Sequence, residues 1–204
     1  RKLKPGTRTI EKGLVSPGDG KMLAFENVSE VKTFFVKGKK FTLKEFLQND
    51  SLAEKYANSS MVILRLAPND YHRYHFPYDG IPSQSEKIEG VYYSVSPISL
   101  AKKFTEVFSE NKKEICKLKT RGRGEILIVP VGATMVGSLN TTFQSDSSIE
   151  KGEEMGYFTF GGSSVVLLFN SDFFELDKDL IENTNNKLET SVKMGEKIAK
   201  ATTK

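Results

Sequence analysis

The sequence predicts an α+β fold that is predominantly β, arranged as a β-sandwich or a distorted barrel with short helices at its periphery. Apolar runs rich in Val, Ile and Leu are short, and Gly, Pro, Asn or Asp interrupts them roughly every ten residues. Segments with helical periodicity are few. Because 204 residues can bury one substantial core, we expect a single domain over 1–204.

Apolar runs bounded by turn residues predict the individual strands. These runs are 22–25, 33–36, 61–66, 90–95, 115–118, 126–131 and 165–169. Their alternation is irregular, so strand pairing cannot be assigned from it. Helices are expected at 43–47, 51–56 and 98–108, with a helical turn at 177–181. The Asn-rich stretch 183–186 predicts a loop, and 192–198 predicts a last strand.

The formal net charge is +4, and basic residues cluster at 37–40, 112–113 and 117–123. Such clusters are typical of solvated turns, or of a surface attracted to anionic lipid. Aromatic residues are not interleaved with these charges on a recognisable module, so we expect no nucleic-acid partner. No run of about 20 apolar residues is present, so no segment is expected to span a bilayer as a helix.

Cysteine and histidine are too scarce for a typical metal centre. Cys116 is the only cysteine, which excludes an internal disulfide, and we expect it to be a small buried residue. His72 and His75 are the only histidines, with Asp70 and Asp79 nearby. A structural zinc site usually needs thiolates or more imidazoles, so no metal site is predicted.

The most informative motif is Gly161-Gly162-Ser163-Ser164-Val165-Val166, considered with Asp70-Tyr71-His72-Arg73-Tyr74-His75. Taken alone, the first segment is typical of a turn that leads into a buried strand. A serine hydroxyl becomes a useful nucleophile only beside a base, and that base needs a partner that fixes its tautomer. The two histidines are the main candidates for proton transfer near neutral pH.

Further motifs occur in register with these two. They are Ser16-Pro17-Gly18-Asp19-Gly20, Leu66-Ala67-Pro68, the segment 129–138 and the segment 150–160. Together they resemble the phosphatidylserine decarboxylase family over most of the chain. Two departures occur: the family's Leu-Gly-Ser-Thr motif is here Gly161-Gly162-Ser163-Ser164, and its Arg-Asn-Glu-Arg stretch is Glu110-Asn111-Lys112-Lys113. The first departure keeps the Gly-Ser bond, and the second removes the arginines.

The resemblance implies a self-cleaving proenzyme. By this resemblance, Asp19 would orient His75, His75 would take the proton of Ser163, and Ser163 would attack the carbonyl of Gly162. Cleavage would divide the single catalytic domain into a β chain, 1–162, and an α chain, 163–204, held together by shared strands. Ser163 would become a pyruvoyl group, the covalent cofactor that forms a Schiff base with the substrate amine. His72 is implied in decarboxylation or reprotonation.

The implied reaction converts phosphatidylserine to phosphatidylethanolamine. The implied partners are this lipid, an anionic membrane surface and the two chains of the cleaved proenzyme, with a homo-oligomer left open. We expect peripheral membrane association. The chain starts at Arg1 without an initiator methionine or a leader, so we expect a targeting or anchoring segment to be absent from it.

Two functions from other classes stay open at this point. Segment 148–156 also resembles the hairpins of biotinyl and lipoyl carrier domains, although no lysine tripeptide appears where a carrier needs it. The other hypothesis is a protein that binds a lipid surface and never undergoes cleavage at its serine. One intact chain would favour the binder, and two chains with pyruvate at position 163 would favour the enzyme.

Overall fold

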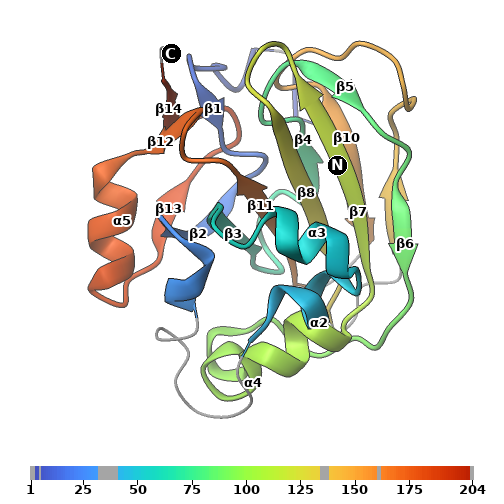
Figure 1. Ribbon diagram of the computed structural model, residues 1–204, viewed down its shortest axis with the longest axis vertical. Helices are drawn as coiled ribbons and strands as arrows, with labels where there is room; N and C mark the ends of the chain where they lie inside the picture. The colour runs from blue at the N-terminus through green and yellow to red at the C-terminus, as the bar shows by residue number, and fades with distance from the viewer. Residues whose placement is uncertain (1–2, 5, 32–40, 134–137, 160–161, 203–204) are drawn as a thin grey trace.

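A large antiparallel sheet forms the centre of the computed structural model, which describes residues 3–4, 6–31, 41–133, 138–159 and 162–202 (Figure 1). Its strand order is β13-β2-β3-β11-β8-β7-β5, with β6 also pairing with β7. The strands are β2 (Gly20–Phe25), β3 (Ser60–Leu66), β5 (Gly80–Pro82), β6 (Glu86–Ile88), β7 (Lys113–Thr120), β8 (Glu125–Val131), β11 (Ser163–Phe169) and β13 (Thr190–Val192). Strand β11, which begins at the candidate serine, therefore lies between β3 and β8 in the interior of the sheet.

Two three-stranded sheets pack on one face of the large sheet. One has the order β1-β14-β12 and the other β4-β10-β9. Their strands are β1 (Leu14–Val15), β14 (Lys197–Ala201), β12 (Phe174–Leu176), β4 (Arg73–His75), β10 (Glu154–Thr159) and β9 (Ser138–Thr141). Tyr74, Phe158 and Phe174 from these sheets share one buried cluster with Leu64 and Val165 of the large sheet. This layer makes the fold a sandwich.

Helices cover the opposite face of the large sheet. They are α2 (Leu43–Leu47), α3 (Asp50–Lys55) and α4 (Pro97–Glu110), and a short 3₁₀ turn, η1 (Val28–Glu30), lies beside them. Phe46 and Phe104 from these helices pack in a second cluster with Ile63, Leu127 and Val166 of the sheet. A sheet that is buried on both faces needs no polar alternation, which explains the irregular pattern of its sequence.

Capping side chains define where the helices begin. Thr42 and Asn49 each accept a bond from a backbone amide in the first turn of α2 and α3. Ser96 does the same for α4, where Pro97 occupies the first position, as expected for a residue without an amide hydrogen. Helix α5 (Lys178–Asn185) packs on β2, where the Ala24 amide donates to the Thr184 hydroxyl.

The predicted β-sandwich with short helices is confirmed, and the strands described here form no closed barrel. Strand segments 22–25, 61–66, 115–118, 126–131 and 165–169 and helix segments 43–47, 51–56 and 98–108 are all confirmed, with bounds that agree within two residues at each end. The predicted strand 33–36 lies outside the described residues. The short strands β1, β5, β6, β9 and β12 were not among the predicted segments.

Three local predictions are wrong, each for a physical reason. Segment 90–95 is not a strand, because the Asn111 side chain bonds both the amide and the carbonyl of Tyr93 and replaces a strand partner. The loop expected at 183–186 is mostly the end of α5, where Thr184 bonds the Leu180 carbonyl. The strand expected at 192–198 is divided into β13 and β14 by a turn in which Gly195 has φ +90°.

Candidate active site

Ser163 is the first residue of β11 and is fully buried. It lies opposite Leu66 of β3, and its Oγ has no hydrogen-bond partner in the described structure. A buried hydroxyl without a partner costs about 1–3 kcal/mol, so an unsatisfied one requires an explanation. Ser164 is equally buried and its Oγ also lacks a partner.

The two serines point to opposite faces of the sheet, because successive strand residues alternate. Val165 packs with the cluster under the small sheets, and Val166 packs with the helices. Ser163 therefore shares the face of Val165, toward the layer that contains β4. Ser164 faces the helices, as does Gly162, where an added Cβ would lie 3.2 Å from Val95 Cγ2. The predicted glycine at 161 lies outside the described residues.

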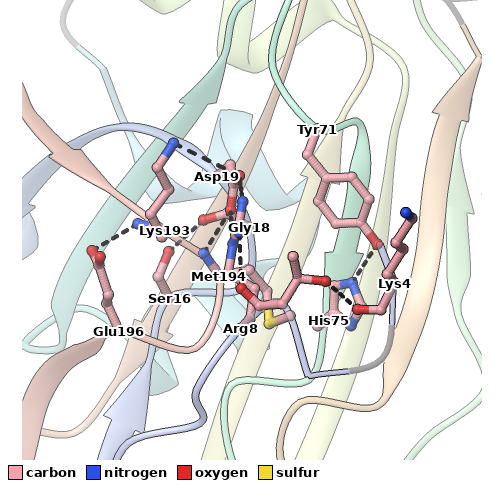
Figure 2. A network of polar contacts seen from close by, with 11 residues as sticks. Lys4, Arg8, Ser16, Gly18, Asp19, Tyr71, His75, Lys193, Met194 and Glu196 are labelled. Atoms are coloured by element: carbon pink, nitrogen blue, oxygen red, sulfur yellow. Dashed lines mark hydrogen bonds and ion pairs between the residues drawn. The ribbon is translucent and has the colours of Figure 1, made fainter. Parts of the chain in front are cut away.

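Asp19 immediately precedes β2 and is buried, with 5% of its surface exposed. Its carboxylate accepts bonds from Arg8, with Nε at 3.2 Å from Oδ1, and from the Met194 amide at 2.8 Å (Figure 2). The Lys193 ammonium lies 3.9 Å from Oδ2. Burial raises the pKa of Asp19, but the bonds from Arg8 and Met194 and the two cations outweigh it and hold that pKa below its usual value.

His75 is the last residue of β4 and is buried. Its Nδ1 lies 2.8 Å from the Gly152 carbonyl, which can only accept, so Nδ1 carries the proton. Nε2 lies 3.0 Å from the Tyr71 hydroxyl, which donates to the neutral ring (Figure 2). Burial lowers the pKa of His75, while the bond to Gly152 and the Glu154 carboxylate counteract this in part. The ring is therefore a neutral base with its lone pair on Nε2.

His72 is half-buried in the segment that connects β3 to β4. Its Nε2 bonds the Pro68 carbonyl at 3.0 Å, and its Nδ1 is buried without a partner. Its backbone carbonyl accepts from the Phe158 amide in β10. His72 thus lies beside the end of β10 from which the chain continues toward Ser163, whereas His75 pairs with Glu154 at the other end.

Sheet topology brings the four candidate residues to one end of the molecule's central layer. Strands β2 and β11 are both antiparallel to β3, so both begin where β3 ends at Leu66. Asp19 precedes one of these strands and Ser163 begins the other, two strand spacings or about 10 Å apart. The segment that leaves Leu66 carries His72 and His75, and the His75 amide donates to Pro17.

The described hydrogen bonds do not join the candidate residues to one another. Asp19 bonds Arg8 and Met194, His75 bonds Gly152 and Tyr71, and Ser163 Oγ bonds none of them. The roles predicted for these side chains stay predictions. Sequence reasoning missed Arg8, Met194 and Gly152, because nothing in the sequence indicates contacts across such separations. Tyr71, four residues before His75, was the one partner within the predicted motif.

Other features predicted from the sequence lie away from the candidate active-site residues. Cys116 is buried, as predicted, and burial raises its pKa to about 12. Lys113, assigned to a basic surface cluster, is fully buried below Phe46, and burial lowers its pKa to about 8. The cluster 37–40 lies outside the described residues. Lys151, in the carrier-like hairpin, donates to the carbonyls of Glu11 and Gly13 rather than extending into solvent.

Two absences hold for the part of the chain that the structure describes. No helix there is long and apolar enough to cross a bilayer. No group of three or more His, Cys, Asp or Glu side chains is placed to hold a metal ion in that part.

Comparison with known proteins identifies the family. The model of the phosphatidylserine decarboxylase family matches residues 1–200. A phosphatidylserine decarboxylase proenzyme of Fusobacterium nucleatum subsp. nucleatum is 52% identical over 200 residues, covering 97% of this chain. This chain belongs to the phosphatidylserine decarboxylase family. Proenzymes of the same name from Clostridium tetani and Clostridium perfringens are 46% and 45% identical over 98% and 97% of the chain.

The chain spans about two thirds of the length of these decarboxylase relatives, from 66% of the Fusobacterium protein to 68% of the clostridial ones. Family membership confirms the resemblance that the separated motifs predicted. It also argues against the carrier alternative, in agreement with the engaged ammonium of Lys151.

Proposed function

We propose that this chain cleaves itself between Gly162 and Ser163 and, in its cleaved form, decarboxylates phosphatidylserine to phosphatidylethanolamine. The observation that carries the proposal is the Ser163 hydroxyl, which is buried and unpartnered directly after a glycine. Its position at the start of β11, beside the end of β3 and two strands from the start of β2, supports the assignment. The relatives are named proenzymes, which agrees with a processing step.

The cleavage needs only side chains of this chain and water. Ser163 Oγ attacks the Gly162 carbonyl carbon, the peptide C–N bond breaks, and the proton of the hydroxyl passes through the base to the released nitrogen. The product is an ester. Loss of the Ser163 α-proton then breaks the Cβ–O bond, leaving Gly162 as a carboxylate and position 163 as dehydroalanine. Water adds, ammonia leaves, and a ketone is formed at the new terminus.

His75 is the proposed base for this step. Its lowered pKa keeps the ring neutral near neutral pH, and the bond from Nδ1 to Gly152 directs the lone pair of Nε2 away from that carbonyl. The Tyr71 hydroxyl occupies this lone pair, so His75 has to exchange Tyr71 for Ser163 before it acts. We assign Asp19 an electrostatic role, because its carboxylate is one of the two that raise the pKa of His75, the other being the stronger contribution of Glu154.

The pyruvoyl group would be built from Ser163 itself. The residues fit such a group, since the hydroxyl is buried and makes no bond that cleavage would have to break. Once formed, the group supplies an electron sink for the carbon that loses CO₂. His72 is proposed to transfer a proton during decarboxylation or reprotonation. Its Nε2 donates to the Pro68 carbonyl, so the buried and unpartnered Nδ1 carries the lone pair and would take up a proton before passing it on. The residue lies beside the end of β10 that leads to Ser163.

The two proposed products would remain one folded body. In the fragment 163–204, β11 pairs with β3 and β8, β13 with β2, and β14 with β1. Breaking one bond at the start of β11 removes none of these ladders. We therefore expect the chains 1–162 and 163–204 to separate only under denaturing conditions.

Substitution of the two neighbouring serines tests the proposal. Ser163→Ala should remain one chain by denaturing gel and intact mass, and should lack decarboxylase activity. Ser164→Ala is the matched control, because it deletes an equally buried and unpartnered hydroxyl from the opposite face. It should still yield two chains, the second lacking a free amino terminus. An uncut wild-type chain that releases CO₂ from phosphatidylserine would refute the proposal, as would unimpaired cleavage in Ser163→Ala.

A further inference from the structure

Large apolar side chains are exposed mainly in one short segment of the described chain. Val91, Tyr92, Tyr93 and Ile98 account for four of the seven exposed large hydrophobic residues, and Ile98 is 71% exposed. Lys102 and Lys103 follow on α4 and are exposed as well. Residues 91–103 are called the α4 rim below. A concentrated apolar patch on a protein surface usually marks a contact with a partner or a membrane.

The α4 rim is held in a defined shape. Asn111, fully buried, bonds the amide and carbonyl of Tyr93 and the carbonyl of Gly132. Ser96 caps the helix, and Val95 is buried beneath the segment. The Lys103 ammonium lies 5.7 Å from the centre of the Tyr93 ring, which connects the helix to the preceding loop. The exposed side chains are therefore presented on a fixed backbone.

The α4 rim borders the proposed cleavage site. A Cβ at Gly162 would lie 3.2 Å from Val95 Cγ2, so the buried side of the rim contacts the residue that precedes Ser163. In Figure 1, α4 lies at the bottom of the molecule, at the opposite end from β14 and β12. A membrane at this end would be adjacent to the reacting bond, and one at the other end would be remote from it.

The composition of the rim matches the boundary between lipid headgroups and acyl chains. Tyrosine rings favour this boundary, aliphatic side chains such as Ile98 insert below it, and each lysine near an anionic surface contributes about 1 kcal/mol. Lys102 lies one turn after Ile98, so its stem can follow the isoleucine while its ammonium stays with the headgroups. The Tyr93 hydroxyl bonds Glu110 and also faces Glu106, so acidic side chains lie at the Tyr93 part of the rim, in the second half of α4, whereas Ile98 and Lys102 lie in its first half.

We propose that the α4 rim is the surface through which this protein contacts an anionic lipid bilayer. The inference rests on the proposed function, because a phospholipid keeps its acyl chains in the bilayer, and its headgroup reaches a carbonyl at position 163 only if the membrane lies next to it. It assigns the lipid contact to the rim rather than to the basic clusters that the sequence indicated.

A single fluorophore tests the contact directly, because the chain contains no tryptophan. Ile98→Trp should shift its emission to the blue and be quenched by brominated phosphatidylcholine when vesicles of phosphatidylcholine and phosphatidylglycerol are added. Leu188→Trp is the control, since Leu188 is also exposed, at 57%, but lies between α5 and β13. It should show neither effect. Equal responses at both positions, or none at Ile98, would overturn the proposal.

Loss of binding provides an independent measurement. Ile98→Asp should lower partition onto these vesicles about tenfold in a flotation assay, since inserting an isoleucine is worth that much or more. Lys102→Glu should weaken binding at low salt, whereas Lys200→Glu, in β14, should not. If Ile98→Asp leaves flotation unchanged and instead dissociates a dimer in light scattering, the rim is occupied by a second copy and the proposal is wrong.

The vesicles contain no phosphatidylserine, so binding is measured separately from catalysis. Ile98→Asp should still cleave itself on a gel and act on dispersed short-chain phosphatidylserine, while losing activity on vesicles. If the wild-type chain never cleaves itself but its flotation with vesicles depends on Ile98, the proposed function is wrong and the proposed membrane contact through the α4 rim is supported. If the wild-type chain cleaves itself and is active, and Ile98→Asp does not change flotation with vesicles, the proposed membrane contact is wrong and the proposed function is supported.

Discussion

The ion pair between Arg8 and Asp19 permits a quantitative prediction. Arg8→Met removes both guanidinium bonds to a buried carboxylate but leaves the bond from the Met194 amide. A hydrogen bond to a charged group contributes about 1.5–3 kcal/mol, and the loss of one partner of a fully buried pair costs about 3–5 kcal/mol. Because the Arg8 side chain is 23% exposed and Met194 remains, we expect a loss of about 2 kcal/mol at neutral pH.

The control for this change is Lys193→Met. Its ammonium also faces Asp19, but at 3.9 Å and with a side chain that is 56% exposed. Exposed pairs of this kind contribute about 0.5 kcal/mol or less. Free energies of unfolding are to be measured by urea denaturation in a Ser163→Ala background, so that every variant is one uncut chain. Equal losses in the two variants would refute the assignment of Arg8 as the main partner of Asp19.

The pH dependence gives a second check on the same pair. In the native protein the pKa of Asp19 lies below its usual value, so the stabilisation is complete above the ordinary carboxyl pKa and is lost as the pH falls through the lowered one. The difference between wild type and Arg8→Met should therefore shrink in acid. In an Asp19→Asn background, Arg8→Met should cost little at any pH. A difference that persists in both conditions would mean that Arg8 stabilises the fold by packing alone.

Two further predictions concern buried titratable groups. If His75 is the base, the rate of self-cleavage rises with pH through a midpoint below that of an ordinary histidine. The Glu154 carboxylate raises the pKa of His75, and the Arg73 guanidinium lowers it. Glu154→Gln should therefore move the midpoint to lower pH, and Arg73→Met should move it to higher pH. Shifts in the same direction would argue against His75. Lys113→Met should stabilise the protein by about 1–3 kcal/mol at neutral pH, because burial opposes the charged ammonium. Native stability should rise between about pH 8 and the usual lysine pKa of 10.5, and the advantage of the variant should vanish there. A constant advantage would mean that burial does not lower the pKa of Lys113.

The sequence by itself determined the central strands, the larger helices and the family. Apolar runs such as 61–66 and 126–131 are strands because β-branched and aliphatic residues fit a pleated, buried surface wherever the chain places them. The motifs around Asp19, His75 and Ser163 could be identified from the sequence because each consists of consecutive residues. The helix caps are local as well, since Thr42, Asn49 and Ser96 act on amides only a few residues away, although they were not predicted from the sequence.

Only the tertiary structure determines which of these motifs lie close together. Asp19 and Ser163 approach because β2 and β11 flank β3, a pairing that depends on packing across the whole sheet. The partners Arg8 and Gly152, the coil at 90–95 held by Asn111, and the burial of Lys113 depend on contacts between distant segments. Local sequence carries the propensity of a residue and its immediate neighbours. The environment of a side chain is set by residues that the fold brings to it, and that environment determines its charge and its reactivity.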